Sequence, residues 1–367
     1  MAAPAGHNLT VAVRVRPLSS KERARGAADC LVVQDGRQIN AIDPDDKMGG
    51  IDYLRLDKTK DKAYAFDHAF DKDVDQPTVF ECTAKRVVPD VLRGGNACVF
   101  AYGATGSGKT YTMMGSDSGP GVVPLTTEAI FDAVDELQEE SATTVTMQFV
   151  EIYNEQIQDL LEPSNGGLDV REAPGRGTFV AGASVVTVGS RQELEGLMHK
   201  GNLYRTTEAT NVNEVSSRSH AVLQLRIEST SRFEDKPVTR VGKLSMIDLA
   251  GSERATKTGN MGKRLTEGAN INRSLLALAN CINALADKTK RMGHVPYRDS
   301  KLTRLLKDSL GGHCKTVRLE ELHPRSHALL CRRLHARCPA DSRSRPSVVA
   351  VPLVTARAPT PPPRRRS

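Results

Sequence analysis

Apolar and polar residues alternate along several short stretches of the chain, and each such stretch is typical of a β-strand. In "NLTVAVRVRPL" at residues 8–18, Val11, Val13 and Val15 fall on one face of the predicted strand. Short, mainly apolar runs at residues 96–102, 144–153, 220–230 and 242–251 predict further strands.

Helical patterns separate these predicted strands. Residues 76–95 begin near Pro77 and end in Gly94 and Gly95, which are helix start and stop signals. Residues 267–288 and 299–310 also have apolar positions at helical spacing. Strands alternating with helices predict an α/β domain, with a central, mixed and mostly parallel sheet flanked by helices on both faces.

The composition of the chain changes after Val317. The last 50 residues contain 11 Arg, three acidic residues and no Gly, Ile or Phe, whereas the preceding 317 residues are almost neutral. A stretch with so few core-forming residues is expected to be disordered or extended. Because the positive charge lies in this tail, the net charge of the protein does not indicate that residues 1–317 bind nucleic acid. We predict an N-terminal extension at residues 1–7, a folded domain at residues 8–317 and a basic tail at residues 318–367.

One glycine-rich stretch carries recognisable chemistry. Residues 100–115 read "FAYGATGSGKTYTMMG", which contains G-x-x-x-x-G-K-T directly after a predicted strand. Such a loop presents backbone N–H groups to phosphate oxygens. Lys109 is expected to reach the β- and γ-phosphates, and the Thr110 hydroxyl to ligate Mg²⁺. The predicted nucleotide-binding residues of the loop are Gly103, Ala104, Thr105, Gly106, Ser107, Gly108, Lys109 and Thr110.

Two further stretches supply groups for the γ-phosphate. "IDLAGSE" at residues 247–253 puts Asp248 at the end of an apolar strand, suited to a water-mediated Mg²⁺ contact, and Gly251 nearby to donate its N–H to the γ-phosphate. "NEVSSRSH" at residues 213–220 is rich in polar groups that can sense the γ-phosphate and hold a nucleophilic water. Arg218 and Glu253 are predicted to form a charged latch that closes when the γ-phosphate is bound.

The nucleotide base is predicted from the residues at the end of the first predicted strand. Arg14 and Pro17 are predicted to sandwich an adenine, with Tyr111 beside it. No N-K-x-D sequence for guanine recognition occurs in the chain, so ATP is predicted rather than GTP. The phosphate-binding loop by itself also fits a kinase, a GTPase or a helicase.

Seven stretches occur in the order in which kinesins have them: "RVRP", "FAYGATGSGKTYTMMG", "EIYNEQIQDLL", "NEVSSRSHAV", "IDLAGSERA", "EGANINRSLLAL" and "VPYRDSKLTRLLKDSLGG". Residues 8–317 therefore resemble a kinesin motor domain, most closely that of the eighth class, whose members move toward microtubule plus ends and shorten them. The resemblance implies the kinesin type of P-loop NTPase fold and a microtubule-stimulated ATPase that uses ATP and Mg²⁺. It also implies that Ser217 joins Thr110 at Mg²⁺, and that Asn213 and Glu253 organise the attacking water.

The resemblance further implies a basic surface that binds acidic tubulin. It predicts a cytoplasmic protein on microtubules, with the spindle as one location, and no membrane partner. Because no heptad run is present, a monomer is predicted. The predicted tubulin-binding residues are Lys257, Lys263, Arg264, Lys288, Lys290, Arg291, Arg298, Lys301, Arg304 and Lys307, with Arg55, Lys58, Lys60 and Lys62 in a second basic stretch.

The chain departs from the kinesin pattern after Val317. Leu319 and Leu322 are expected to belong to a poor strand at best, because Glu320 and Glu321 fall where apolar side chains are expected and burying unpaired carboxylates is costly. The last helix and the neck linker are not recognisable. Three alternative origins would each account for this segment: a shifted reading frame, an alternative exon or a genuine divergent tail. The sequence thus supports two functions: an ATP-hydrolysing microtubule motor, or a microtubule-binding protein that does not step because its last strand, helix and neck linker are missing.

Overall fold

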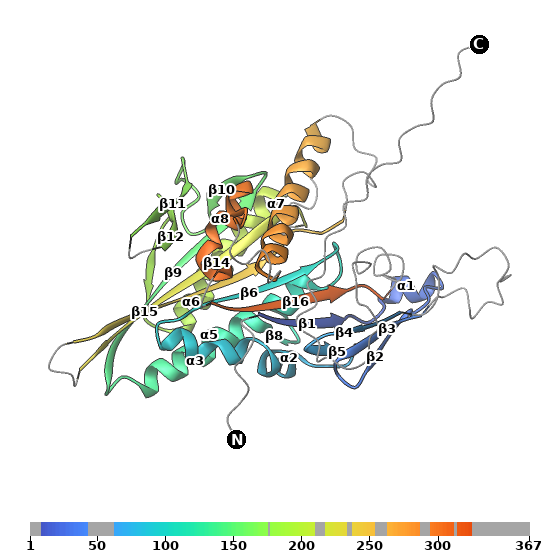
Figure 1. The fold of residues 1–367 in the computed structure, drawn as a ribbon, viewed down its shortest axis with the longest axis horizontal. Coiled ribbons are helices and arrows are strands. Elements are labelled where there is room, and N and C mark those ends of the chain that lie inside the picture. The colour runs from blue at the N-terminus through green and yellow to red at the C-terminus, as the bar shows by residue number, and fades with distance from the viewer. Residues whose placement is uncertain are drawn as a thin grey trace, which may run out of the picture.

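The computed structural model describes residues 9–42, 62–174, 177–209, 217–232, 237–253, 263–286, 294–311 and 314–324. In this part of the chain a large mixed sheet runs through the centre, with helices on both faces (Figure 1). The predicted α/β architecture is confirmed.

The described part of the central sheet has nine strands, eight of them in the order β10-β9-β14-β15-β6-β16-β1-β5, with β13 pairing with β9. Neighbouring strands from β15 to β5 are parallel, and those from β10 to β15 are antiparallel. The strands are β1 (Leu9–Val15), β5 (His68–Phe70), β6 (Asn96–Gly103), β9 (Ser141–Tyr153), β10 (Gln156–Asp159), β13 (Val186–Val188), β14 (Ser219–Ser231), β15 (Thr239–Asp248) and β16 (Lys315–Leu322).

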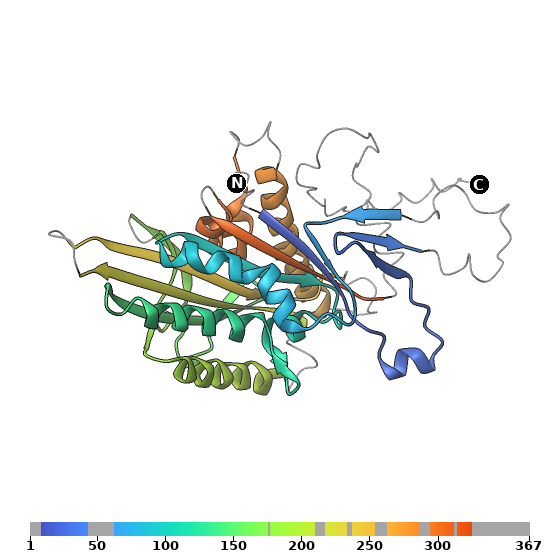
Figure 2. The same ribbon diagram turned by 90° about the horizontal axis from the view of Figure 1, so that it is seen from below.

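Two helical layers cover the sheet. Helices α2, α3, α5 and α6 lie on one face, seen in front in Figure 2, whereas α7 and α8 lie on the other face (Figure 1). Side chains alternate along β6, so Val99 packs into the core under α5 and α6 while Phe100 packs with Leu278 of α7 and Leu302 of α8. The helices are α1 (Ser20–Ala24), α2 (Gln76–Cys82), η3 (Ala84–Val87), α3 (Val88–Leu92), α4 (Lys109–Met114), α5 (Val122–Glu136), α6 (Arg191–Ala209), α7 (Lys263–Ala286), η6 (Tyr297–Asp299), α8 (Lys301–Leu305) and α9 (Lys307–Leu310).

Three smaller sheets lie outside the central sheet. Besides the apolar cores on the two faces of the central sheet, another apolar cluster joins Val13, Val15 and Leu322 of that sheet to Leu31 and Ile39 of the sheet β2-β3-β4. No helix in the described residues is both long enough and apolar enough to cross a bilayer. The remaining strands are β2 (Leu31–Gln34), β3 (Gln38–Ala41), β4 (Lys62–Ala65), β7 (Gly115–Ser116), β8 (Gly119–Pro120), β11 (Asp169–Ala173) and β12 (Gly177–Ala181).

The predicted end of the folded domain at residue 317 is wrong. Strand β16 continues to Leu322 and lies between β6 and β1, pairing in parallel with both (Figure 1). Val317 and Leu319 of this strand are part of the core. The last strand is therefore present, and the predicted tail is wrong for residues 318–322. Residues 325–367, on which the rest of the tail prediction and the last helix fall, lie outside the described residues.

Two of the buried charges of β16, those of Arg318 and Glu320, compensate each other. The side chains of Arg318 and Glu320 project to the same face of the sheet and form an ion pair of 3.0 Å. The Arg318 guanidinium also lies 4.9 Å from the centre of the Tyr102 ring, a cation–π contact. Glu321 projects to the opposite face, toward the phosphate-binding loop. The prediction of a poor strand is wrong because the strand pairs along its whole length with β1 and β6, and because Glu320 has a partner, Arg318, within the strand.

Candidate nucleotide-binding site

The glycine-rich loop begins where β6 ends. A Cβ on Gly103 would lie 2.5 Å from the carbonyl oxygen of Glu321 in the neighbouring strand, so only glycine fits this close approach. Gly108 has φ of 112°, in the left-handed region that favours glycine, and immediately precedes α4. The predicted strand, loop and helix are thus found in this order.

Lys109 is buried against the loop from which it projects. Its Nζ donates to the carbonyl oxygens of Gly103 at 3.0 Å and Ala104 at 2.9 Å. Burial lowers the pKa of Lys109, and the negative charges of Asp248, Glu253 and Glu321 oppose this shift. Phosphate oxygens can replace the two carbonyl acceptors, which is the exchange expected of a lysine in such a loop.

Thr110, the predicted Mg²⁺ ligand, is in direct contact with Asp248, which is predicted to reach the ion through water. The hydroxyl of Thr110 donates to Oδ2 of Asp248 across 2.8 Å. The other oxygen, Oδ1, is buried and has no hydrogen-bond partner among the described residues. Ser217 is held nearby through its backbone, since its carbonyl oxygen accepts from the N–H of Gly251. Hydroxyl and carboxylate oxygens are the donors that Mg²⁺ prefers, so these residues fit the ion.

The segment after Asp248 lies on the phosphate-binding loop. Ser252 N–H donates to the carbonyl oxygen of Gly103 at 3.0 Å. The carboxylate of Glu253 accepts from the backbone N–H of Thr105 at 2.8 Å and from the Thr105 hydroxyl. The predicted latch between Arg218 and Glu253 stays a prediction, because the contacts described for Glu253 are those with Thr105. Asn213 lies outside the described residues.

The adenine site differs from the prediction at Arg14. This side chain is only 7% exposed, and its guanidinium donates to Gln76, Thr112 and the carbonyl oxygen of Val74 at 2.7–2.9 Å. It lies 5.3 Å from the centre of the Tyr111 ring, which is itself 44% exposed. Stacking of Arg14 directly on a base does not fit this burial. Arg14 instead supports Tyr111, and Tyr111 and the exposed Pro17 are the groups left for the base.

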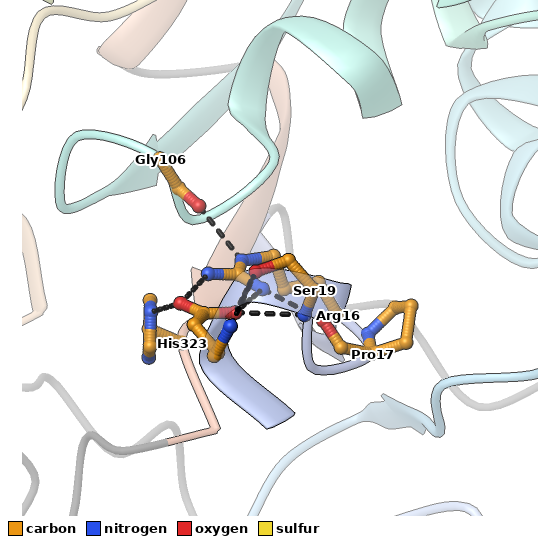
Figure 3. A network of polar contacts seen from close by, with 6 residues as sticks. Arg16, Pro17, Ser19, Gly106 and His323 are labelled. Carbon is orange, nitrogen blue, oxygen red and sulfur yellow. Dashed lines mark hydrogen bonds and ion pairs between the residues drawn. The ribbon is translucent and has the colours of Figure 1, made fainter. Parts of the chain in front are cut away.

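Arg16, which the sequence analysis did not select, connects this edge of the site to the loop. Figure 3 shows its Nε donating to the carbonyl oxygen of Gly106 at 2.7 Å, and its two terminal nitrogens pairing with the Glu22 carboxylate at 2.6 and 2.8 Å. The same carboxylate lies 2.6 Å from Nε2 of His323, directly after β16, and caps α1 through Ser19 (Figure 3). Chiefly because of Arg16, the pKa of Glu22 is held well below its usual range.

Arg205 is a second residue that the sequence analysis missed. It is buried on α6 and reaches Glu151 at 3.3 Å, Asp248 at 3.4 Å and both the hydroxyl and the carbonyl oxygen of Ser219. A buried guanidinium between two carboxylates fixes the orientation of Asp248. Its partners are separated from it by 14 to 54 residues in the sequence, so no local pattern reveals it.

His220 connects the same region to helix α7. Its Nδ1 accepts from the N–H of Ala250 at 3.0 Å, and its Nε2 lies 2.7 Å from the hydroxyl of Ser274 on α7. Burial, together with the charges of Arg205 and Lys109, lowers the pKa of His220 to about 3, so the ring is neutral and Nε2–H donates to Ser274. A rigid ring therefore joins the segment after β15 to α7.

The predicted tubulin-binding residues are described only in part. Arg298 and Arg304 are exposed, whereas Lys301 and Lys307 pair with Asp169 at 3.4 Å and Glu172 at 2.5 Å on β11. These residues belong to η6, α8 and α9; η6 and α8 contact α7, and α8 is seen beside α7 in Figure 1. Lys263, Arg264 and Lys62 belong to α7 and β4, but their side chains are not described. Lys257, Lys288, Lys290, Arg291, Arg55, Lys58 and Lys60 lie outside the described residues.

Comparison with known proteins agrees with this geometry. The family model "Kinesin motor domain" matches residues 14–330, and the chain belongs to this family. Kinesin-like protein KIF19 of Xenopus laevis is 48% identical over 319 residues, covering 87% of this chain and 32% of its own length. Kinesin-like protein KIN-8B of Arabidopsis thaliana is 46% identical over 317 residues (86% and 38%), and Kinesin-like protein KIF18B of Mus musculus is 45% identical over 325 residues (86% and 39%).

These similarities confirm the resemblance to the eighth kinesin class. The family match continues beyond residue 317, in agreement with the presence of β16. The chain spans about a third of the length of these curated relatives.

Proposed function

We propose that this chain is a motor domain that hydrolyses Mg-ATP and couples the turnover to binding of microtubules. The observation that carries the proposal is the direct bond between Thr110 and Asp248, next to an oxygen of Asp248 that lacks a partner among the described residues. This arrangement places a hydroxyl ligand, and a carboxylate suited to a water-mediated contact, at the end of a phosphate-binding loop.

In this proposal each group has a positioning or electrostatic role. Lys109 and the loop backbone bind the phosphates, and Thr110 and Ser217 hold Mg²⁺, with Asp248 contacting it through water. The bound Mg²⁺ neutralises the charge of the phosphate oxygens. Asn213 and Glu253 orient the attacking water, and Gly251 donates its N–H to the γ-phosphate. Tyr111 and Pro17 contact the adenine, with Arg14 behind Tyr111.

Coupling to the microtubule runs through α7 in this proposal. A movement of residues 249–253 on binding the γ-phosphate acts on His220 through Ala250 N–H, and on α7 through Ser274. Helix α7 packs beside η6 and α8, which carry the exposed residues Arg298 and Arg304. A chain with these parts is expected in the cytoplasm on microtubules, including those of the spindle.

The alternative is a microtubule-binding protein that does not step. The observed strand β16 removes one of the reasons for it, because the central sheet has no gap between β1 and β6. Hydrolysis and microtubule binding are therefore proposed for this chain itself. Movement along the lattice and regulation of microtubule ends are further proposals, because the chain spans about a third of the length of its curated relatives.

The test is ATP turnover by the full chain, with and without microtubules. Stimulation by microtubules of tenfold or more is expected for the wild type, and Lys109→Ala is expected to lose it. Lys85→Ala is the matched control, because Lys85 is an exposed lysine that pairs with Glu81 on α2. Microtubule co-sedimentation without stimulated turnover would favour the non-stepping alternative, and turnover that survives in Lys109→Ala would overturn the nucleotide site.

A further inference from the structure

Strand β16 puts a carboxyl group beneath the phosphate-binding loop. In the register of the sheet, Glu321 pairs with Arg14 of β1 on one side and with Gly103 of β6 on the other. Gly103 is the last residue of β6, so Glu321 lies at the level where the strand becomes the loop. The proposed nucleotide site assigns no role to Glu321.

Glu321 is packed closely against the loop. It is 2% exposed, and a Cβ on Gly108 would lie 3.4 Å from its Oε2. Its own Cβ would lie 3.1 Å from a Cβ on Gly103. The side chain and the loop backbone therefore share a single, tightly filled space.

The carboxyl group has little polar compensation. Oε1 has no hydrogen-bond partner among the described residues, and a hydrogen bond from Thr112 lowers the pKa of the Glu321 carboxyl less than burial raises it. Thr112 also accepts from Arg14 at 2.9 Å, and the other hydrogen bonds described for the Arg14 guanidinium go to Gln76 and Val74. The positive charge of Arg14 is thus near Glu321 but is hydrogen-bonded elsewhere.

Charged groups from several elements surround this carboxyl group. Arg14 faces it from β1 and Lys109 from α4, and both favour its ionised form, whereas Asp248 of β15 disfavours it. Arg16 lies across Gly108, where a Cβ would be 4.0 Å from that of Arg16. Burial is the largest influence, and the pKa of Glu321 is raised to about 7.

We propose that Glu321 is a positioning residue that sets the nucleotide affinity of the phosphate-binding loop. The inference rests on the proposed function, because it concerns a polyanionic nucleoside di- or triphosphate bound by that loop. The ionised carboxylate adds negative charge directly below the loop and draws on the positive charge of Lys109, which the phosphates need. It therefore weakens nucleotide binding. A neutral side chain of the same shape relieves both effects and leaves the packing unchanged.

The experiment measures the dissociation constant of Mg-ADP for the full chain by calorimetry at pH 6, 7 and 8. Glu321→Gln is expected to bind Mg-ADP about tenfold more tightly than the wild type at pH 8, on the order of the effect of one unit charge in a partly shielded site. The difference is expected to shrink toward none at pH 6, where the wild-type carboxyl is itself neutral. Because each comparison is made at one pH, the titration of the nucleotide cancels.

Glu320→Gln is the matched control. Glu320 is the neighbouring buried carboxylate on the same strand, but it projects to the opposite face and pairs with Arg318. This variant is expected to match the wild type within about twofold at every pH. Proton uptake on binding Mg-ADP, measured at pH 7.5 in two buffers of different ionisation enthalpy, gives a second readout. Proton uptake is expected in the wild type and in Glu320→Gln. This measurement does not depend on whether a Glu321 variant folds.

The outcomes separate this inference from the proposed function. Equal affinities of wild type and Glu321→Gln at pH 8, a ratio that does not change with pH, or absence of proton uptake would each mean that Glu321 only fills space. Failure of the wild type to bind Mg-ADP, or undiminished binding by Lys109→Ala, would overturn the nucleotide site and this inference together.

Discussion

The backbone N–H of Gly251 donates to the carbonyl oxygen of Ser217 across 2.8 Å. The two residues come from the two segments predicted to recognise the γ-phosphate, and the bond joins these segments. The donor proposed to sense the γ-phosphate therefore has a partner inside the protein. Sensing requires an exchange of acceptors, from the Ser217 carbonyl to a phosphate oxygen, and this exchange releases one segment from the other.

A side chain at position 251 is expected to block this exchange. A Cβ there would lie 2.5 and 2.6 Å from the carboxylate oxygens of Glu253 and closer still to the Thr105 hydroxyl. Gly251→Ala is expected to bind Mg-ADP within about threefold of the wild type and to lose tenfold or more of microtubule-stimulated turnover, a barrier change of about 1.4 kcal/mol or more. Gly196→Ala is the control, since nothing lies within 4 Å of a Cβ at that helical position. Normal stimulation in Gly251→Ala would contradict the exchange.

Removal of the Glu253 carboxylate tests the same region differently. Glu253→Ala loses both bonds to Thr105 but introduces no new atoms. The variant is expected to bind ATP and to show little or no stimulation of turnover by microtubules, because its segment no longer closes on the loop. Glu228→Ala, which removes an exposed carboxylate on β14, serves as the control. Nucleotide binding and steady-state turnover, measured side by side, distinguish lost coupling from lost affinity.

The sequence predicted those parts of the site that depend on local pattern. The phosphate-binding loop directly follows an apolar strand, and Asp248 ends another, so both follow from alternation and turn residues. Arg205 and His220 were missed because their partners are distant in sequence, and nothing in the local pattern identifies a buried cation or a bridging ring.

The errors at Arg14 and β16 have a common physical cause. Each error concerns charged residues in a strand. The sequence alone does not tell whether such a residue faces solvent or a compensating group. Arg14 finds Gln76 and Thr112 in the interior, and Arg318 compensates Glu320. Tertiary contacts therefore reversed two predictions that were reasonable for isolated strands.

Two buried groups are expected to give opposite pH dependences of stability. The pKa of His220 is lowered to about 3, so the unfolded chain takes up a proton below about pH 6.5 and the folded protein loses stability on acidification. The pKa of Glu321 is raised to about 7, so the folded protein takes up a proton first, and stability is gained as the pH falls from 7 to 4.5. Between pH 4.5 and 6.5 the two contributions cancel, each at up to about 1.4 kcal/mol per pH unit.

Single substitutions separate the two contributions. Glu321→Gln removes the contribution of Glu321 and keeps that of His220, so its free energy of unfolding is expected to fall relative to that of the wild type on acidification from pH 6.5 to 4.5. His220→Gln removes the contribution of His220 and keeps that of Glu321, so its free energy of unfolding is expected to rise relative to that of the wild type over the same range. Urea unfolding at four pH values measures both slopes relative to the wild type. Parallel pH profiles for the two variants would contradict the opposite shifts.

Loss of Arg205 is expected to be costly. Arg205→Ala leaves the buried carboxylates of Glu151 and Asp248 without their cation, and breaking a buried ion pair from one side costs about 3–5 kcal/mol. Arg226→Ala, which breaks an exposed pair with Glu228, is expected to cost about 1 kcal/mol or less. Thermal unfolding of the two variants checks this contrast. A small effect of Arg205→Ala would mean that the two carboxylates find other partners.

The exposed cations near α7 and α8 are expected to control binding to the acidic microtubule lattice. Arg298 and Arg304 are exposed, while Lys301 and Lys307 are already paired with carboxylates of β11. Reversal of the charge in Arg298→Glu or Arg304→Glu is therefore expected to weaken binding more than the same change at Lys301 or Lys307. The reduction is expected to be about tenfold at low ionic strength and smaller in about 0.3 M salt, because salt screens exposed charges.

Arg93→Glu provides the matched control for these variants. Arg93 is an exposed arginine directly after α3, on the other face of the sheet, and pairs with Asp90. Its reversal changes the net charge of the protein by the same amount but lies away from α7 and α8. Co-sedimentation with microtubules at several salt concentrations compares the variants. An equal loss of affinity in Arg93→Glu would mean that net charge, rather than the surface around α7 and α8, determines binding.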